Sequence, residues 1–235
     1  MKVRLFTLPY SGSSASIYLR WNSLLSEQIE VVPLELPGRG KRFSSKLCGS
    51  MAELIEDLYV HVKDQINEQP YAIYGHSLGG LVAYELSVKL MEQGHRLPMH
   101  LFLSGCNPPH LRYGEENLHT LPDALFLERI IKLGGTAVEL QSNPEMMRVF
   151  VPIIKSDYKI YELYAGTGKV TELPVDFSVM TGTNDPLMPM EHGRQWKKYT
   201  QGSFRLIEMQ GGHFFIHDQL DRVIDAVESA LIVHK

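Results

Sequence analysis

The sequence predicts an α/β fold, in which a mostly parallel β-sheet carries helices on both faces and a helical insertion interrupts the pattern. Short apolar runs typical of strands alternate along the chain with longer segments of helical periodicity. Such alternation is typical of parallel sheets, because each parallel strand must be reached by a crossover connection. At 235 residues the chain is long enough for one large core. We therefore expect a single domain over residues 1–235.

The composition is that of an ordinary globular protein, with 44% hydrophobic and 21% charged residues. A net charge of −4 argues against a nucleic-acid-binding surface. No stretch approaches the roughly 20 apolar residues of a membrane span, and no signal peptide is recognisable, so we expect a cytoplasmic protein without a membrane partner. The two cysteines, Cys48 and Cys106, form no disulfide framework and lack metal-ligand spacing. We expect reduced thiols and no bound metal.

The first part of the chain supplies two predicted strands and a helix. Apolar runs at residues 3–8 and 29–36 predict the strands. Ser50 has capping-box spacing to a glutamate, and the apolar residues that follow it form one helical face, which predicts a helix over residues 50–69. Pro70 ends this helix, because the residue before a proline avoids the helical conformation.

The remaining sheet elements follow the same alternation. Residues 71–74 predict a short buried strand, and residues 78–93 predict a helix that ends near Gly94. The later elements are three strands and a closing helix, at residues 100–104, 175–181, 204–209 and 217–233.

The segment at residues 118–163 breaks the alternation, because it contains helical patterns and no strand. Its first helix, in residues 121–135, has a glycine stop, and its second, in residues 143–164, has a kink or break predicted at Pro152. A helical insertion between strands favours a lid over the carboxyl edge of the sheet, where ligands bind in open α/β folds. The alternative is a helical layer that only completes the core.

The stretch YAIYGHSLGGLVAYEL, at residues 71–86, contains the pattern Gly-x-Ser-x-Gly between a predicted strand and a predicted helix. Ser77 would sit at a sharp turn that lifts its hydroxyl above the sheet, a nucleophile elbow. Gly75 and Gly79 would let strand and helix approach closely. The alternative is an ordinary serine in a glycine-rich loop, so the interpretation depends on partners elsewhere in the chain.

A serine nucleophile needs a base, and His213 is the best placed of the ten histidines. It follows Gly211 and Gly212, after the last strand and before the last helix. His76 lies inside the elbow, and we expect it to point away from any base position. His61, His95, His100 and His234 are expected to have packing or surface roles. His110 and His119 flank the insertion as candidates to line a pocket, and His192 lies at a predicted helix start.

The acid that orients the histidine should follow the preceding strand, and Asp185 does so. It would accept a hydrogen bond from Nδ1 of His213 and stabilise the imidazolium. The alternative for Asp185 is an ordinary turn residue. Asp176 is a rival, but it begins the strand and so lies at the wrong edge. Asp218 and Asp221 are too close to His213 along the last helix.

An oxyanion hole needs two N–H donors. The first is the backbone N–H of Leu78, the residue after the nucleophile. The second should come from the loop LPYSGSSAS, at residues 8–16, with Ser11 as the expected donor. Taken alone, this loop could be only a flexible serine-rich turn.

With these residues in place, the chain resembles the α/β-hydrolases. More narrowly, it resembles the stand-alone type II thioesterases that accompany nonribosomal peptide and polyketide synthetases. The matching motifs span nearly the whole chain in order: LPYSGSSAS, ELPGRGKR, YGHSLGG, SGCNPPH, LPDALFLERIIKLGG, KSDYKIYELY, TGTNDPLMP and GGHFFI. Two positions depart from the family pattern: Ser13 replaces a glycine in the early loop, and Leu78 stands where methionine is frequent.

The resemblance implies hydrolysis of acyl thioesters on the phosphopantetheine arm of carrier proteins, which clears mis-primed carriers. It implies Ser77 as nucleophile, His213 as base, Asp185 as orienting acid, and Ser11 and Leu78 as oxyanion donors. No cofactor of the enzyme itself is expected, since the substrate carries the phosphopantetheine, and we expect a monomer. A general carboxylesterase or an acyltransferase with the same triad is the alternative.

Two further features bear on the partner. The basic cluster Lys41, Arg42 and Lys46 is a candidate contact for an acidic carrier protein, although a solvated loop would look the same. The apolar residues Leu125, Phe126 and Ile130 of the insertion could guide the acyl arm, although a helix buries such a stripe in any case.

Overall fold

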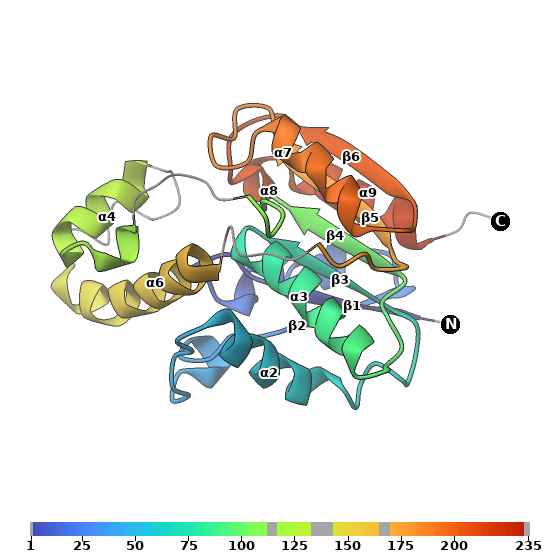
Figure 1. The fold of residues 1–235 in the computed structure, drawn as a ribbon, viewed down its shortest axis with the longest axis horizontal. Helices are drawn as coiled ribbons and strands as arrows, with labels where there is room; N and C mark the ends of the chain where they lie inside the picture. Colours follow the sequence, from blue (N-terminus) through green and yellow to red (C-terminus); the bar gives the residue numbers. More distant parts are fainter. Residues whose placement is uncertain (1, 112–116, 133–142, 165–169, 233–235) are drawn as a thin grey trace.

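The computed structural model describes residues 2–111, 117–132, 143–164 and 170–232, and its centre is a six-stranded parallel sheet (Figure 1). The strand order is β2-β1-β3-β4-β5-β6, and every pairing is parallel. The strands are β1 (Val3–Leu8), β2 (Ile29–Pro33), β3 (Tyr71–His76), β4 (His100–Ser104), β5 (Asp176–Gly182) and β6 (Phe204–Met209). The predicted fold class and all six predicted strands are confirmed.

Both faces of the sheet are buried at its central strands β3 and β4, whereas the edge strands β2 and β6 are partly exposed and include charged residues. On one face, Ile73 of β3 and Leu101 of β4 join a cluster with α2 (Met51–Val62) and α3 (Leu78–Glu92). On the other face, Tyr74 and Phe102 join a cluster with α9 (Leu220–Leu231). Neighbouring residues of a strand thus enter opposite layers, as the period of two requires. The shorter elements are η1 (Ala15–Tyr18), α1 (Trp21–Leu24), η2 (Gly40–Arg42), α7 (Met190–Gln195), η4 (Trp196–Tyr199) and α8 (Phe215–Asp218).

The described parts of the segment at residues 118–163, which are 118–132 and 143–163, are mainly helical, as predicted. It contains η3 (Leu118–Thr120), α4 (Asp123–Lys132) and α6 (Pro144–Tyr164). The glycine stop predicted at Gly134 and Gly135 lies outside the described residues. In Figure 1, α4 and α6 extend from the side of the molecule to which the carboxyl ends of the strands point. These two helices share an apolar cluster of their own: Phe126, Leu127, Ile130, Val151 and Ile154.

Three helix predictions differ from the structure, and the strand predicted at residues 29–36 ends earlier, at Pro33. The helix at residues 50–69 ends at Val62, although Ile66 beyond it is still fully buried, so the apolar periodicity outlasts the helix. The closing helix is divided into α8 and α9, because the backbone of Gln219 is not helical. Helix α6 continues through Pro152 without a break. Proline has no N–H to donate to the carbonyl of Arg148, four residues earlier, but both residues are exposed, so water can solvate that carbonyl.

Within the described ranges, no helix is both long and apolar enough to cross a membrane.

Candidate active site

Ser77 stands at the sharp turn between β3 and α3. Its backbone has φ 54° and ψ −120°, and it is the one non-glycine residue with positive φ among those that the structure describes. The two glycines of the pattern are required by close approach. A Cβ on Gly75 would lie 2.0 Å from the carbonyl oxygen of Gly79, and a Cβ on Gly79 would lie 2.2 Å from that of Leu8. Backbone strain of this kind is typical of functional sites.

The side chain of Ser77 does not cap α3, although serine is a favoured N-cap residue. The turn is instead held by its backbone, since the N–H of Ser77 donates to the carbonyl of Ser104 at 2.7 Å. The Ser77 hydroxyl is therefore not engaged in capping the helix that it begins.

His213 and Asp185 form a buried pair at the carboxyl ends of β6 and β5. Nδ1 of His213 lies 2.8 Å from Oδ2 of Asp185, and each residue is only 5% exposed. The other carboxylate oxygen accepts the N–H groups of Leu187 at 2.8 Å and Met188 at 3.1 Å. Both oxygens of the Asp185 carboxylate are therefore held by hydrogen bonds. A proton on Nδ1 leaves Nε2 of His213 as an acceptor, the form that a general base needs.

The rival acid lies elsewhere. Asp176 is the first residue of β5, and its carboxylate accepts the N–H of Ser203 at 2.7 Å. It therefore lies at the amino end of the strand, away from His213, as expected from the sequence.

His76 lies against His213, which the sequence interpretation did not foresee. The two ring centroids are 5.3 Å apart. The ring of His76 is fully buried, with Nδ1 2.8 Å from Oγ of Ser104, and its Nε2 finds no partner among the described residues. Burial, with a smaller effect of His213, holds the pKa of His76 well below its ordinary value. His76 is therefore neutral, and its position directly before Ser77 was the signal that could have identified it.

The loop at residues 9–14, called here the oxyanion loop, lies against the elbow. The N–H of Ser13 donates to the carbonyl of Tyr10 at 3.0 Å, which makes a turn with Ser11 and Gly12 at its centre. Among the described residues, the N–H of Ser11 donates to no protein acceptor. The N–H of Leu78 belongs to the first turn of α3, where amides have no acceptor within their own helix.

Aromatic side chains surround the oxyanion loop, and the sequence interpretation had not singled them out. Tyr10 packs edge-to-face on His76 and Phe214, and its hydroxyl lies 3.1 Å from Nε2 of His217. Burial raises the pKa of the Tyr10 hydroxyl above its ordinary value, so Tyr10 is uncharged at neutral pH.

The other histidines are occupied elsewhere. His110 bonds to the hydroxyl of Tyr199, His192 to the side chain of Asn107, and His119 pairs with Glu162. His61, His95 and His100 bond to Asp57, Tyr59 and Ser178, and His234 lies outside the described residues. Within the described ranges, no three acidic, histidine or cysteine side chains are grouped as a metal site would require.

Comparison with known proteins gives consistent matches along the chain. A family model described as "Thioesterase domain" matches residues 3–231. The chain is 35% identical to linear gramicidin dehydrogenase LgrE of Brevibacillus parabrevis, over 98% of this chain and 88% of the relative. It is 32% identical to thioesterase PikA5 of Streptomyces venezuelae, over 98% of this chain and 82% of that relative. A solved structure, ClbQ from the colibactin NRPS/PKS pathway, superposes with a TM-score of 0.92 at 40% identity, covering 98% of this chain and 97% of that one.

Proposed function

Since this chain belongs to the thioesterase family, among the type II thioesterases of nonribosomal peptide and polyketide synthetase pathways, we propose that it removes acyl groups from carrier proteins. The bond cleaved is the thioester that joins an acyl group to the phosphopantetheine arm, and the products are a carboxylic acid and the free thiol. Clearing mis-primed arms in this way restores a stalled synthetase. The partner of the enzyme is thus a carrier domain of that synthetase.

The observation that carries the proposal is the His213–Asp185 pair at the sheet edge where the Ser77 elbow lies. We assign Ser77 as nucleophile, His213 as base and Asp185 as its orienting acid. The dehydrogenase name of the gramicidin relative describes that protein, whereas a serine elbow beside a His–Asp pair supports acyl transfer.

In the first half of the proposed reaction, Nε2 of His213 takes the proton of Ser77 while Oγ attacks the thioester carbonyl. The N–H groups of Ser11 and Leu78 stabilise the negative oxygen of the tetrahedral intermediate. The carbon–sulfur bond then breaks, and the imidazolium protonates the departing sulfur. Because a thiol has a pKa near 8.5, the sulfur needs little help from the acid.

In the second half, water attacks the acyl-enzyme. His213 removes a proton from the water, and the same two N–H groups stabilise the second tetrahedral intermediate. Its collapse releases the carboxylic acid and returns the proton to Ser77. Throughout, Asp185 keeps the proton of His213 on Nδ1, so that Nε2 faces the reacting atoms.

We further propose that residues 118–163 act as a lid over this edge of the sheet, within one domain. Support comes from the close packing of α6 on the oxyanion loop, since a Cβ on Gly12 would lie 2.5 Å from Cγ1 of Ile154. Phe126 and Ile130 are buried inside the helical segment, whereas Leu125 is 52% exposed. Leu125 is thus the member of the predicted apolar stripe that remains available to guide an acyl arm.

Fewer residues of the basic cluster Lys41, Arg42 and Lys46 are available for a carrier contact than the sequence suggested. Arg42 forms two hydrogen bonds of 2.6 Å with the carboxylate of Asp57, so its charge is already paired. Any electrostatic contact of this loop with an acidic carrier would therefore depend on Lys41 and Lys46.

The test is hydrolysis of a carrier protein loaded with an acetyl group, by the wild-type enzyme and by Ser77→Ala. Ser87→Ala is the matched control, because it makes the same change on α3, where the Ser87 hydroxyl bonds only to the carbonyl of Ala83. We expect Ser77→Ala to lose turnover and Ser87→Ala to keep it. Unchanged turnover by folded Ser77→Ala would refute the mechanism.

Substrate comparison separates the proposal from its alternatives. We expect kcat/KM to be much higher for the acetyl carrier protein than for a nitrophenyl acetate ester. Equal values would favour a general carboxylesterase. Transfer of the acetyl group to an added thiol or alcohol in preference to water would favour an acyltransferase.

A further inference from the structure

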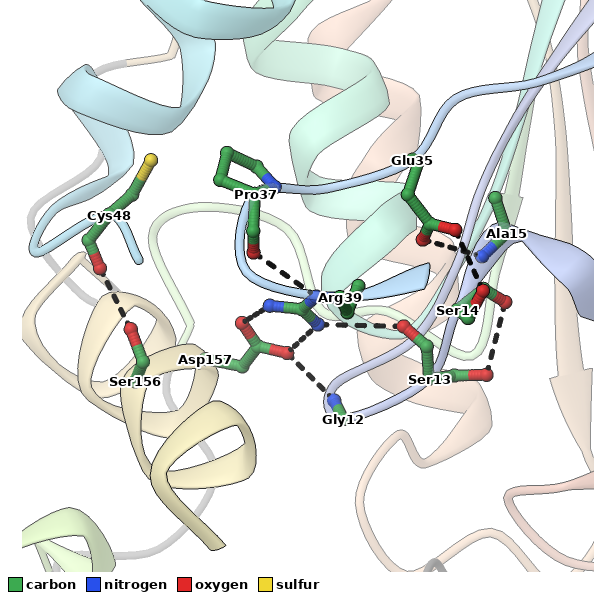
Figure 2. Close-up of polar contacts among 10 residues, drawn as sticks. All are labelled: Gly12, Ser13, Ser14, Ala15, Glu35, Pro37, Arg39, Cys48, Ser156 and Asp157. Atoms are coloured by element: carbon green, nitrogen blue, oxygen red, sulfur yellow. Dashed lines mark hydrogen bonds and ion pairs between the residues drawn. The ribbon is translucent and has the colours of Figure 1, made fainter. Parts of the chain in front are cut away.

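A buried ion pair connects α6 to the loop after β2, next to the oxyanion loop. Arg39, in the loop after β2, contacts Asp157 of α6 through two hydrogen bonds, 2.5 Å from Nη1 to Oδ2 and 2.7 Å from Nη2 to Oδ1 (Figure 2). The two residues are 5% and 1% exposed. A buried pair is weak evidence for stability, since desolvation opposes the attraction, so its position invites a functional explanation.

The same carboxylate accepts a hydrogen bond from the backbone of the oxyanion loop. The N–H of Gly12 donates to Oδ2 of Asp157 at 2.7 Å, and Nη1 of Arg39 lies 3.5 Å from the carbonyl of Ser13 (Figure 2). Gly12 has φ +79°, and as the third residue of the turn from Tyr10 to Ser13 it gives the turn a type II character. Asp157 therefore holds the peptide group that joins Ser11 to Gly12.

This peptide group adjoins the one between Tyr10 and Ser11, which carries the Ser11 N–H, so its orientation constrains the backbone of Ser11. Type I and type II turns differ by a flip of their central peptide, and glycine at the third position permits both. The bond from Gly12 to Asp157 selects one orientation, and the bond from Ser13 to Tyr10 closes the turn. With both in place, the backbone of Ser11 is fixed and its N–H stays free for an oxyanion.

We propose that Asp157, held by Arg39, is a positioning residue for the oxyanion hole. It touches no reacting atom and acts through Gly12 on the N–H of Ser11. The inference rests on the proposed function, because it assigns Ser11 as an oxyanion donor. It adds that α6, part of the proposed lid, supplies a group without which that donor is not pre-organised.

The test compares Asp157→Asn with Ser156→Ala. The first substitution keeps the size of the side chain but removes its charge. In either orientation of the amide, its NH2 group replaces an oxygen that accepts from Arg39 or from Gly12, so a donor then faces a donor. The control removes the neighbouring tether of the same helix, since the Ser156 hydroxyl donates to the carbonyl of Cys48 and not to the oxyanion loop (Figure 2). We expect kcat of Asp157→Asn to fall about tenfold or more with KM little changed, because loss of a whole oxyanion donor costs about 10²–10³. Ser156→Ala should have the kcat of the wild type.

A second readout reports on the oxyanion hole directly. A trifluoromethyl ketone analogue of the acyl-pantetheine forms a tetrahedral adduct with the serine and carries the negative oxygen. Its affinity for Asp157→Asn should fall by the same factor as kcat/KM. An unchanged affinity alongside a reduced kcat would overturn the proposal, since the defect would then lie outside the oxyanion hole.

A double variant, Arg39→Met with Asp157→Leu, separates positioning from stability. Replacing a buried ion pair by apolar residues of similar volume is often neutral for stability. We therefore expect the double variant to unfold at a higher temperature than Arg39→Met alone. Its kcat should nevertheless be as low as that expected of Asp157→Asn. If kcat recovers together with stability, the pair is only structural and the proposal is wrong.

Failure of this inference can be told from failure of the proposed function. The proposed function fails if the wild type does not hydrolyse the acyl carrier protein, or if Ser77→Ala still does. The positioning role fails if the wild type is active and folded Asp157→Asn has the same kcat.

Discussion

At the scale of single residues, the site contains two adjacent imidazole rings, those of His213 and His76, in different environments. His213 is paired with a carboxylate, whereas His76 is buried and kept neutral beside it. A neutral His76 matters for the proposed mechanism, because a second positive charge there would oppose the imidazolium that His213 forms in it. The ring contact therefore favours the proposed base.

Asp185→Asn should abolish most activity while leaving the fold intact. The asparagine oxygen can still accept the N–H groups of Leu187 and Met188, which fixes its amide nitrogen toward His213. An amide nitrogen there forces the proton of His213 from Nδ1 to Nε2, and the histidine can no longer accept a proton from Ser77. We expect kcat to fall by about 10³–10⁴, as in other serine triads, with an unchanged circular dichroism spectrum. A loss of less than tenfold would contradict the assignment.

At the scale of elements, the elbow depends on how closely β3, α3 and the end of β1 approach one another. Gly79→Ala introduces a Cβ 2.2 Å from the carbonyl oxygen of Leu8, and this neighbour is backbone that cannot rotate away. We expect the free energy of unfolding to fall by more than about 2 kcal/mol, measured by urea denaturation.

Gly49→Ala is the control for that substitution. Its nearest atom would be the flexible carboxylate of Glu53 at 3.5 Å, so the change should alter stability by less than about 0.5 kcal/mol. Similar losses for the two variants would argue against close packing as the reason for glycine at the elbow.

The sheet also contains a pH-sensitive histidine away from the site. His100, the first residue of β4, stacks on Phe102 and bonds to the Ser178 hydroxyl. Burial lowers its pKa to about 4; Asp176 raises it and Arg205 lowers it by smaller amounts. An unfolded histidine has a pKa near 6.5, so between these values the unfolded chain binds the proton and the folded one does not. His100 thus stabilises the fold fully above about pH 6.5 and loses that contribution as the pH falls toward 4.

His100→Asn should remove this dependence. Between pH 7 and pH 5, we expect the wild type to lose about 2 kcal/mol more free energy of unfolding than the variant, measured by urea denaturation at each pH. Carboxylates that do not interact with His100 contribute equally to both proteins, and the effect of Asp176 on His100 is smaller than that of burial, so the difference reports mainly on His100. Parallel losses in wild type and variant would contradict the lowered pKa.

At the scale of the whole molecule, the apolar interior of the described ranges is divided into three clusters. Two lie on the faces of the sheet, and the third joins α4 to the first half of α6. Helix α6 connects the third cluster to the first, since Ile154 belongs to one and Ile160 to the other. We therefore expect α4 to open without unfolding the sheet.

Phe126→Ala tests this independence. Phe126 is fully buried in the third cluster, where its ring packs edge-to-face on Tyr158. The cavity should speed amide hydrogen exchange in α4 and leave the exchange of the six strands unchanged. Phe177→Ala, in the first cluster, is the control and should speed exchange throughout the sheet. Uniform loss of protection in Phe126→Ala would show that the clusters unfold together.

Much of the fold and of the candidate site could be predicted from local patterns. The central strands β3 and β4 are buried along their whole length, because both faces of a parallel sheet are covered, whereas the edge strand β6 also carries Arg205 and Glu208. Ser77, Asp185 and His213 each follow a strand, and the carboxyl ends of parallel strands share one edge, so the sequence by itself determined that these residues lie at one edge of the sheet.

The tertiary structure alone decided the contacts that cross from one layer to another. The pairing of Arg39 with Asp157 joins residues 118 apart in sequence, and the contact of His76 with His213 joins two strand ends. Neither follows from periodicity, because a helical pattern specifies which face of α6 is apolar but not which loop that helix packs against. The sequence determined which polar side chains lie at the sheet edge, whereas only the packing of α6 decided that Asp157 and Arg39 contact the oxyanion loop.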